Sequence, residues 1–161
     1  NKNTIACITG GSSSNDANHI SGPSRTGEGL FTAIEQTLQE AKTDAKCIDY
    51  ISAHGTATLY NDEMEAIAFS RAGLTEVPVN SFKGYFGHTL GGSGLIESVL
   101  TLYSMQHGFL FKTMGYEKPG VSHPINVIKE HTNAKLTHCL KTGSGFGGSN
   151  AAILFSKEDG K

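Results

Sequence analysis

The chain has 161 residues, of which 37% are hydrophobic and 17% charged, a composition typical of one soluble globular domain over residues 1–161. The net charge of −2 and the lack of a basic stretch argue against nucleic-acid binding, and the apolar runs are too short to cross a membrane. Three widely spaced cysteines, Cys7, Cys47 and Cys139, favour buried reduced thiols in a cytoplasmic protein over disulfides.

The first apolar run, residues 4–9, is expected to form a strand, and it starts so close to the first residue that we expect the chain to be part of a longer protein. Residues 10–28 are rich in Gly, Ser and Asn and are expected to form a long polar loop. A helix is expected over 29–43, because apolar side chains recur there at near-helical spacing. Residues 47–53 form a short apolar run typical of a buried strand.

A second helix is expected from Asn61 or Asp62, with Glu65 placed for a capping box and Gly73 as the stop. The next expected strand covers 77–81 and leads into the glycine-rich loop 84–94. The helix that follows, roughly 92–106, is apolar on most faces. We therefore expect it to be central and buried.

Residues 109–135 are expected to be irregular, and the chain ends in two strands, 136–143 and 150–156. This order of elements predicts an α/β domain whose sheet is largely parallel, with helices on its faces. The five expected strands make the sheet mixed, because the last two form an antiparallel pair.

Two histidines in glycine-flanked loops, His54 and His88, each follow an expected strand and precede an expected helix. Loops at the carboxyl ends of strands are where α/β sheets bind ligands, so we expect two N–H donors that meet one oxygen. A neutral imidazole in that position acts as an electrophilic catalyst. Thr56 and Thr58 lie two residues apart, and in extended backbone both hydroxyls would point to one side. The plainer interpretation is that each histidine is a structural or solvent-facing loop residue.

Lys83 lies five residues before His88, and Glu97 is the one acidic residue in an apolar helix. Because a buried carboxylate needs a cation, Lys83 is the expected partner of Glu97. An exposed lysine is the simpler alternative. The turn around Phe146 in residues 145–148 is either an ordinary hairpin turn or a movable gate that presents a backbone N–H to an anion. The glycine runs lack the spacing of a phosphate-binding loop, and the histidines lack the spacing of a metal site.

Four groups of motifs follow one another along the chain, and together they are typical of one enzyme family. They are Asp16-Ala17-x-His19, His54-Gly55-Thr56-x-Thr58 with Asp62 and Glu65, Lys83-x4-His88 with Glu97, and Gly145-Phe146-Gly147-Gly148-Ser149-Asn150. From about Thr4 to Phe155 the chain resembles the C-terminal half of the β-ketoacyl synthases of fatty acid and polyketide synthesis. These are thiolase-like enzymes built from two similar α/β halves, and the nucleophilic cysteine belongs to the N-terminal half.

The resemblance implies a decarboxylative Claisen condensation between an acyl thioester and malonyl thioester on acyl carrier protein. His54 and His88 would donate N–H hydrogen bonds to the malonyl thioester oxygen. Lys83, paired with Glu97, would maintain the electrostatic field and the geometry around His88. The Phe146 N–H would complete an oxyanion hole while its ring gates the acyl channel.

The resemblance also implies partners but no covalently bound cofactor. Thr56 and Thr58, and more weakly Ser21, would bind the phosphopantetheine arm of the carrier protein. The other implied partners are the N-terminal half, which this chain would need for activity, and a second copy in a homodimer. No nucleic acid and no membrane are implied.

The sequence departs from the family pattern at residues 80–82, 91–94 and 109–120, which suggests a divergent synthase. Two other classes stay open. One is a non-catalytic partner such as a chain-length factor. The other is a different thiolase-fold enzyme or a Ser/His hydrolase, although no G-x-S-x-G motif is present.

Overall fold

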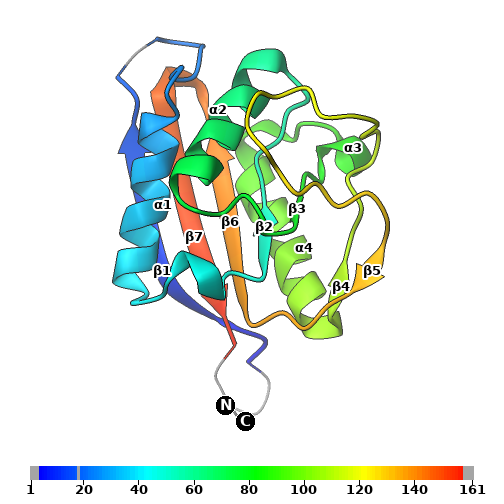
Figure 1. The fold of residues 1–161 in the computed structure, drawn as a ribbon. Coiled ribbons are helices and arrows are strands. Elements are labelled where there is room, and N and C mark those ends of the chain that lie inside the picture. Colours follow the sequence, from blue (N-terminus) through cyan, green and yellow to red (C-terminus); the bar gives the residue numbers. More distant parts are fainter. Residues whose placement is uncertain (1–3, 18, 158–161) are drawn as a thin grey trace.

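The centre of the molecule is a mixed five-stranded sheet with the strand order β1-β7-β6-β2-β3. The computed structural model describes residues 4–17 and 19–157 (Figure 1). The strands of this sheet are β1 (Cys7–Asn15), β2 (Tyr50–Ser52), β3 (Val79–Asn80), β6 (His138–Ser144) and β7 (Ser149–Ser156). A separate two-stranded antiparallel sheet joins β4 (Phe109–Leu110) to β5 (Thr132–Asn133), in a region expected to be irregular.

The direction of the strands differs along the sheet. β2 runs parallel to both β3 and β6, whereas β7 runs antiparallel to β6 and β1. The mixed five-stranded sheet and its closing antiparallel pair are confirmed, but the expectation of a largely parallel sheet is wrong, because the longest ladders are those of β7. The parallel strands β2 and β3 end side by side, so the segments that follow them, with His54 and Lys83, meet at the same end of the sheet.

Strand β1 corrects the expected loop over 10–28, because its polar residues up to Asn15 pair with β7 in register. An edge strand can be polar, since its outer face and free edge meet solvent. Gly10 also explains the packing here. A Cβ on Gly10 would lie 2.3 Å from the backbone oxygen of Thr37, so glycine allows the first helix to lie directly on β1.

Helices cover both faces of the sheet (Figure 1). α1 (Glu28–Glu40) and α2 (Leu59–Arg71) lie on one face, and α4 (Ser93–His107) lies on the other. The remaining helical turns are α3 (Lys83–Phe86), η1 (Ala45–Cys47), η2 (Leu90–Gly92) and η3 (Phe146–Gly148). Two of these turns, α3 and η2, occupy the segment that the sequence predicts as a glycine-rich loop.

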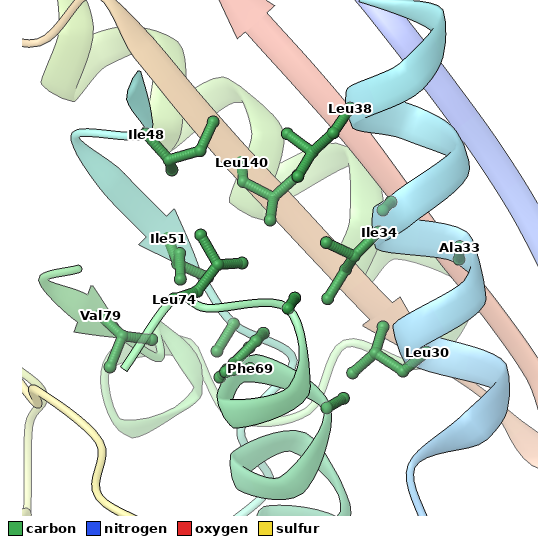
Figure 2. Close-up of a cluster of buried hydrophobic side chains, with 14 of the residues drawn as sticks. Leu30, Ala33, Ile34, Leu38, Ile48, Ile51, Phe69, Leu74, Val79 and Leu140 are labelled. Carbon is green, nitrogen blue, oxygen red and sulfur yellow. The ribbon is translucent and has the colours of Figure 1, made fainter. Parts of the chain in front are cut away.

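The larger apolar core lies between the sheet and helices α1 and α2. Leu30, Ile34 and Leu38 project from α1 towards Leu140 of β6 and Ile51 of β2 (Figure 2). All five side chains are at most 6% exposed. Burial of a side chain of this size stabilises the fold by about 1.5–3 kcal/mol, so this core provides much of the stability.

The second core, on the opposite face of the sheet, involves α4 through Met105, which packs near Tyr50, Cys139 and Phe155. The rest of the buried face of α4 is polar: Ser93, Glu97, Thr101 and Ser104. The outward face is apolar: Leu95 is 73% exposed, Val99 56% and Tyr103 48%. The expectation that α4 is central and buried is therefore wrong for this chain, because nothing in the described residues covers that outward face.

The cysteines only partly follow the prediction of buried thiols. Cys139 is buried, whereas Cys47 is exposed and Cys7 is half-buried. Burial raises the pKa of the Cys139 thiol well above its usual range, which makes this thiol unreactive. Within residues 4–17 and 19–157, no helix is long and apolar enough to span a membrane.

Candidate active site

The loop that carries His54 is held by two carboxylates of helix α2. Glu65 accepts the backbone N–H groups of His54 at 2.8 Å and Gly55 at 2.6 Å, and Asp62 accepts that of Thr56 at 3.1 Å. The expected capping box is therefore wrong: α2 starts at Leu59, and Glu65 binds the preceding loop instead of capping its own helix. Burial raises the pKa of Glu65, although the two N–H bonds act in the opposite direction.

Lys83 links the His54 loop to helix α4. Its Nζ lies 2.7 Å from Glu97 Oε1 and 3.3 Å from His54 Nδ1, and it also donates to the backbone oxygen of His54. The Lys83 and Glu97 side chains are 8% and 5% exposed, so the ion pair expected from the sequence forms away from solvent. An ammonium has three protons, and these three acceptors use all of them.

His88 lies in the loop between α3 and α4 and is exposed. Its Nδ1 accepts the backbone N–H of Leu90 at 3.1 Å and lies 3.3 Å from the Ser93 hydroxyl. Because Nδ1 accepts a hydrogen bond, the neutral ring carries its proton on Nε2.

The two histidine rings lie together, with centroids 5.2 Å apart and planes at 77°. The Lys83 ammonium can only donate to His54 Nδ1, so the neutral ring of His54 also carries its proton on Nε2. Burial, followed by the positive charge of Lys83, lowers the pKa of His54 to about 3. The neutral Nε2–H form is therefore fixed at physiological pH, and such a ring donates a hydrogen bond instead of accepting a proton.

Lys141 of β6 is a residue that our sequence interpretation missed. Its Nζ lies 2.7 Å from Glu97 Oε2, and its side chain is 4% exposed. Burial lowers the pKa of Lys141, while the charge of Glu97 acts against that shift. The available signal was a lysine in the middle of an expected strand, because a lysine is rarely buried unless it is paired.

The two threonines lie next to a pocket of about 680 Å³. Thr56, Thr58, Lys83 and His88 line it, together with residues of the 113–121 segment. The hydroxyls of Thr56 and Thr58 are 2.7 Å apart, so they point to one side as expected. The expected extended backbone between them is wrong, because Ala57 has a φ of +55°. His54 does not line the pocket itself, although its neighbours Ala53 and Gly55 do.

Phe146 belongs to a different loop and does not line this pocket, and its side chain is 82% exposed. Two backbone hydrogen bonds hold the loop: Asp16 N donates to the oxygen of Gly148 at 2.8 Å, and Gly147 N donates to the oxygen of Ile20. Gly148 has a φ of +76°, and a Cβ there would lie 3.1 Å from that of Asp16. The turn is therefore more than a plain hairpin turn, since it is tied to the loop after β1.

The loop after β1 contains His19 and Ser21. His19 Nδ1 accepts the backbone N–H groups of Ser21 and Gly22, each at 3.1 Å. Ser21 is exposed and does not line the pocket, so the structure does not bring it to Thr56 and Thr58. In the part of the chain that the structure describes, no three His, Cys, Asp or Glu side chains cluster in a way that could hold a metal ion.

The family model for the C-terminal domain of β-ketoacyl synthases matches residues 5–117. The chain belongs to this family. A putative mitochondrial 3-oxoacyl-[acyl-carrier-protein] synthase of Schizosaccharomyces pombe is 35% identical over 98% of this chain and 39% of its own length.

Solved structures agree with the family assignment. A β-ketoacyl synthase from Burkholderia phymatum superposes with a TM-score of 0.90 at 30% identity, over 96% of this chain and 38% of that one. A ketosynthase solved in complex with a type II polyketide acyl-carrier protein gives a TM-score of 0.88 at 28% identity, covering 96% of this chain and 39% of that one. The chain therefore spans about two fifths of the length of these relatives.

Proposed function

We propose that this chain is the C-terminal half of a β-ketoacyl-acyl-carrier-protein synthase and supplies the half of the active site that activates the malonyl thioester. The observation that carries the proposal is the pair of neighbouring imidazoles, His54 and His88, each of which presents an Nε2–H. Two neutral donors can bind one thioester oxygen without taking a proton from the substrate. This arrangement suits an enolate, which gains charge on that oxygen as carbon dioxide leaves.

In this proposal Lys83 positions the donors. Its contacts with Glu97 and with both the ring and the backbone oxygen of His54 fix the orientation of that ring. Its three acceptors leave Lys83 no proton to donate to substrate. We therefore propose that Lys83 orients His54 and adds a positive charge beside it, and that it transfers no proton. Lys83 would affect the position of His88 only through the contact between the two histidine rings.

The other implied roles are also part of the proposal. Thr56 and Thr58 would bind the phosphopantetheine arm of acyl carrier protein, because their paired hydroxyls line the pocket. The Phe146 N–H would face the acyl carbonyl while the exposed ring gates the acyl channel. Ser21 is the weakest member, since the loop that carries it is tied to the Phe146 turn and is not part of the pocket.

We further propose that an N-terminal half with the nucleophilic cysteine covers the apolar face of α4 formed by Leu95, Ile96, Val99 and Tyr103. Contiguous exposed apolar side chains of this size mark an interaction surface. The full protein would act as a homodimer in the cytoplasm, where an exposed thiol such as that of Cys47 stays reduced. The isolated chain would show no condensation.

The donor role can be tested by malonyl-thioester decarboxylation in the full-length protein. We expect His54→Ala and His88→Ala each to lower the decarboxylation rate by about 10²–10³, the usual cost of removing one such donor. Gln39→Ala, on the exposed side of α1, is the control and should keep the wild-type rate. Unchanged rates in both histidine variants would reject the proposal.

A second candidate is a non-catalytic partner such as a chain-length factor. None of Cys7, Cys47 and Cys139 lines the pocket, which fits this candidate and a catalytic C-terminal half equally well. The distinguishing observation is the residue at the nucleophile position of the full protein. A cysteine there would support catalysis, and Gln or Ala would support the partner role.

A further inference from the structure

Lys141 is a buried cation that the proposed mechanism does not use. Four oxygens surround its ammonium: Glu97 Oε2 at 2.7 Å, the backbone oxygens of Ser52 at 3.2 Å and Ala53 at 3.4 Å, and that of Thr142, to which it also donates. Ser52 and Ala53 lead directly into His54. The lysine therefore contacts both the backbone that supports His54 and the carboxylate that binds Lys83.

The buried charges of this region balance one another. Glu65 and Glu97 supply two negative charges, and Lys83 and Lys141 supply two positive ones; each side chain is almost inaccessible to solvent. A buried charge without a partner is strongly unfavourable. Without Lys141, Glu97 would keep only its ion pair with Lys83, and Glu65 would lose the positive charge of Lys141 that acts on it.

The balance matters most for Lys83, which divides its three N–H groups between Glu97 and His54. Glu97 uses its two oxygens separately, Oε1 for Lys83 and Oε2 for Lys141. If Lys141 were neutral, Glu97 would attract Lys83 more strongly with both oxygens and draw it away from His54 Nδ1.

We propose that Lys141 is a positioning residue: its ammonium forms an ion pair with Oε2 of Glu97, so that Lys83 stays bonded to His54 and holds that ring as the Nε2–H tautomer. This inference rests on the proposed function for its effect on catalysis, but its effect on His54 can be measured without any activity.

Charged groups around His54 come from several elements. Burial is the largest cause of the lowered pKa of His54, and the charges of Lys83 of α3, Lys141 of β6 and then His88 lower it further. Glu65 of α2 and Glu97 of α4 lie beyond the His54 backbone and the lysines. Loss of the Lys141 charge should therefore make His54 easier to protonate.

The test compares Lys141→Met, which keeps the length of the side chain but not its charge, with Lys141→Arg, which keeps the charge. Lys46→Met removes an exposed lysine and is the matched control. The full-length protein with ¹⁵N-labelled histidine is titrated by NMR between about pH 5 and 8, the range in which histidines usually change charge. Malonyl-thioester decarboxylation is measured on the same samples.

We expect the wild-type protein, Lys46→Met and Lys141→Arg to keep His54 neutral with its proton on Nε2 throughout. In Lys141→Met, the His54 titration should move up into the measured range or the tautomer should change. The kcat for decarboxylation should fall by up to about 100-fold, the cost of a small misplacement, while KM stays near the wild-type value. If Lys141→Met does not fold, Lys141→Gln replaces it, because an amide can still bond the carbonyl oxygens.

A wild-type His54 spectrum in the uncharged variant would overturn the inference, whatever its activity. A loss of activity without any change at His54 would also overturn it, since Lys141 would then act by another route. If the wild-type protein shows no decarboxylation, the proposed function fails, and the His54 titration alone still decides the role of Lys141.

Discussion

Helices α1 and α4 lie on opposite faces of one sheet and distribute polarity in opposite ways. α1 buries Leu30, Ile34 and Leu38 and turns its charged residues outward. α4 buries Ser93, Glu97, Thr101 and Ser104, while Leu95 and Val99 face outward. α1 is thus a stabilising helix whose packing is complete within the chain. α4 supports a buried polar site on one side and presents an apolar surface on the other.

The largest expected effect concerns the apolar face of α4. Leu95→Asp combined with Val99→Asp should abolish condensation in the full-length protein, because two buried unpaired charges would prevent the N-terminal half from docking. Gln39→Asp on the exposed side of α1 should leave condensation unchanged. The measurement is condensation activity together with size-exclusion chromatography. Normal activity in the double variant would show that this face is not an interface.

The two helices should also differ in their contribution to stability. Leu30→Ala should lower the free energy of unfolding by about 2–5 kcal/mol, because it leaves a cavity between α1 and the sheet. Leu95→Ala should change the stability of the chain alone by no more than about 0.5 kcal/mol, since its side chain is 73% exposed. Urea unfolding of both variants tests the difference. Equal losses would contradict the contrast between α1 and α4.

The polar side of the sheet should make stability depend on pH through His54. Its pKa is lowered to about 3 in the folded chain, mainly by burial, from the ordinary value of 6.5. Because the unfolded chain binds the proton more tightly, this contribution to stability is complete above about pH 6.5 and is lost as the pH falls towards 3. The slope approaches about 1.4 kcal/mol per pH unit, that of one proton.

The measurement compares urea unfolding of the wild-type chain and His54→Gln over this pH range. The difference between the two removes the opposing contribution of Glu65, whose raised pKa favours the folded state at acid pH. Parallel pH profiles for the two chains would show that His54 is not held neutral.

The smallest expected effect is the loss of one side-chain hydrogen bond in each helix. Two buried threonines whose hydroxyls donate to backbone oxygens allow this comparison. Thr37 of α1 donates to Ala33 O and to Ala152 O, whereas Thr101 of α4 donates to Glu97 O. Each substitution by valine should cost about 1 kcal/mol. Thr101→Val should in addition slow decarboxylation, because Glu97 lies one turn away. Thr37→Val should leave the rate unchanged, and an equal slowing in both variants would argue against a special role for α4.

Part of this contrast could be predicted from the sequence. The helical spacing of Leu30, Ile34 and Leu38 predicts α1, since its buried partners belong to the same chain. The same rule fails for α4, because an apolar helix surface indicates burial without saying what covers it. The second part of β1, from Gly10 to Asn15, was missed for a related reason: its glycines and serines are typical of a loop, and their strand conformation depends on pairing with β7, far away in the sequence.

The candidate site shows a similar division. Lys83 and Glu97 could be paired from the sequence, because they are close in the chain and one apolar helix contains a lone carboxylate. Lys141 could not be assigned, since the chain brings β6 beside β2 only in the folded state. The backbone role of Glu65 was missed because a capping box and a loop anchor use the same residue types at almost the same spacing.

The most direct test of the central claim is a crystal structure of the full-length protein with a non-hydrolysable malonyl thioester analogue. We predict that Nε2 of His54 and Nε2 of His88 both lie about 2.7–3.2 Å from the thioester oxygen, with the Lys83 ammonium still bonded to His54 Nδ1. If the oxygen binds elsewhere, or if one of the two Nε2 atoms is turned away from it, the two histidines do not form the donor pair that this account requires.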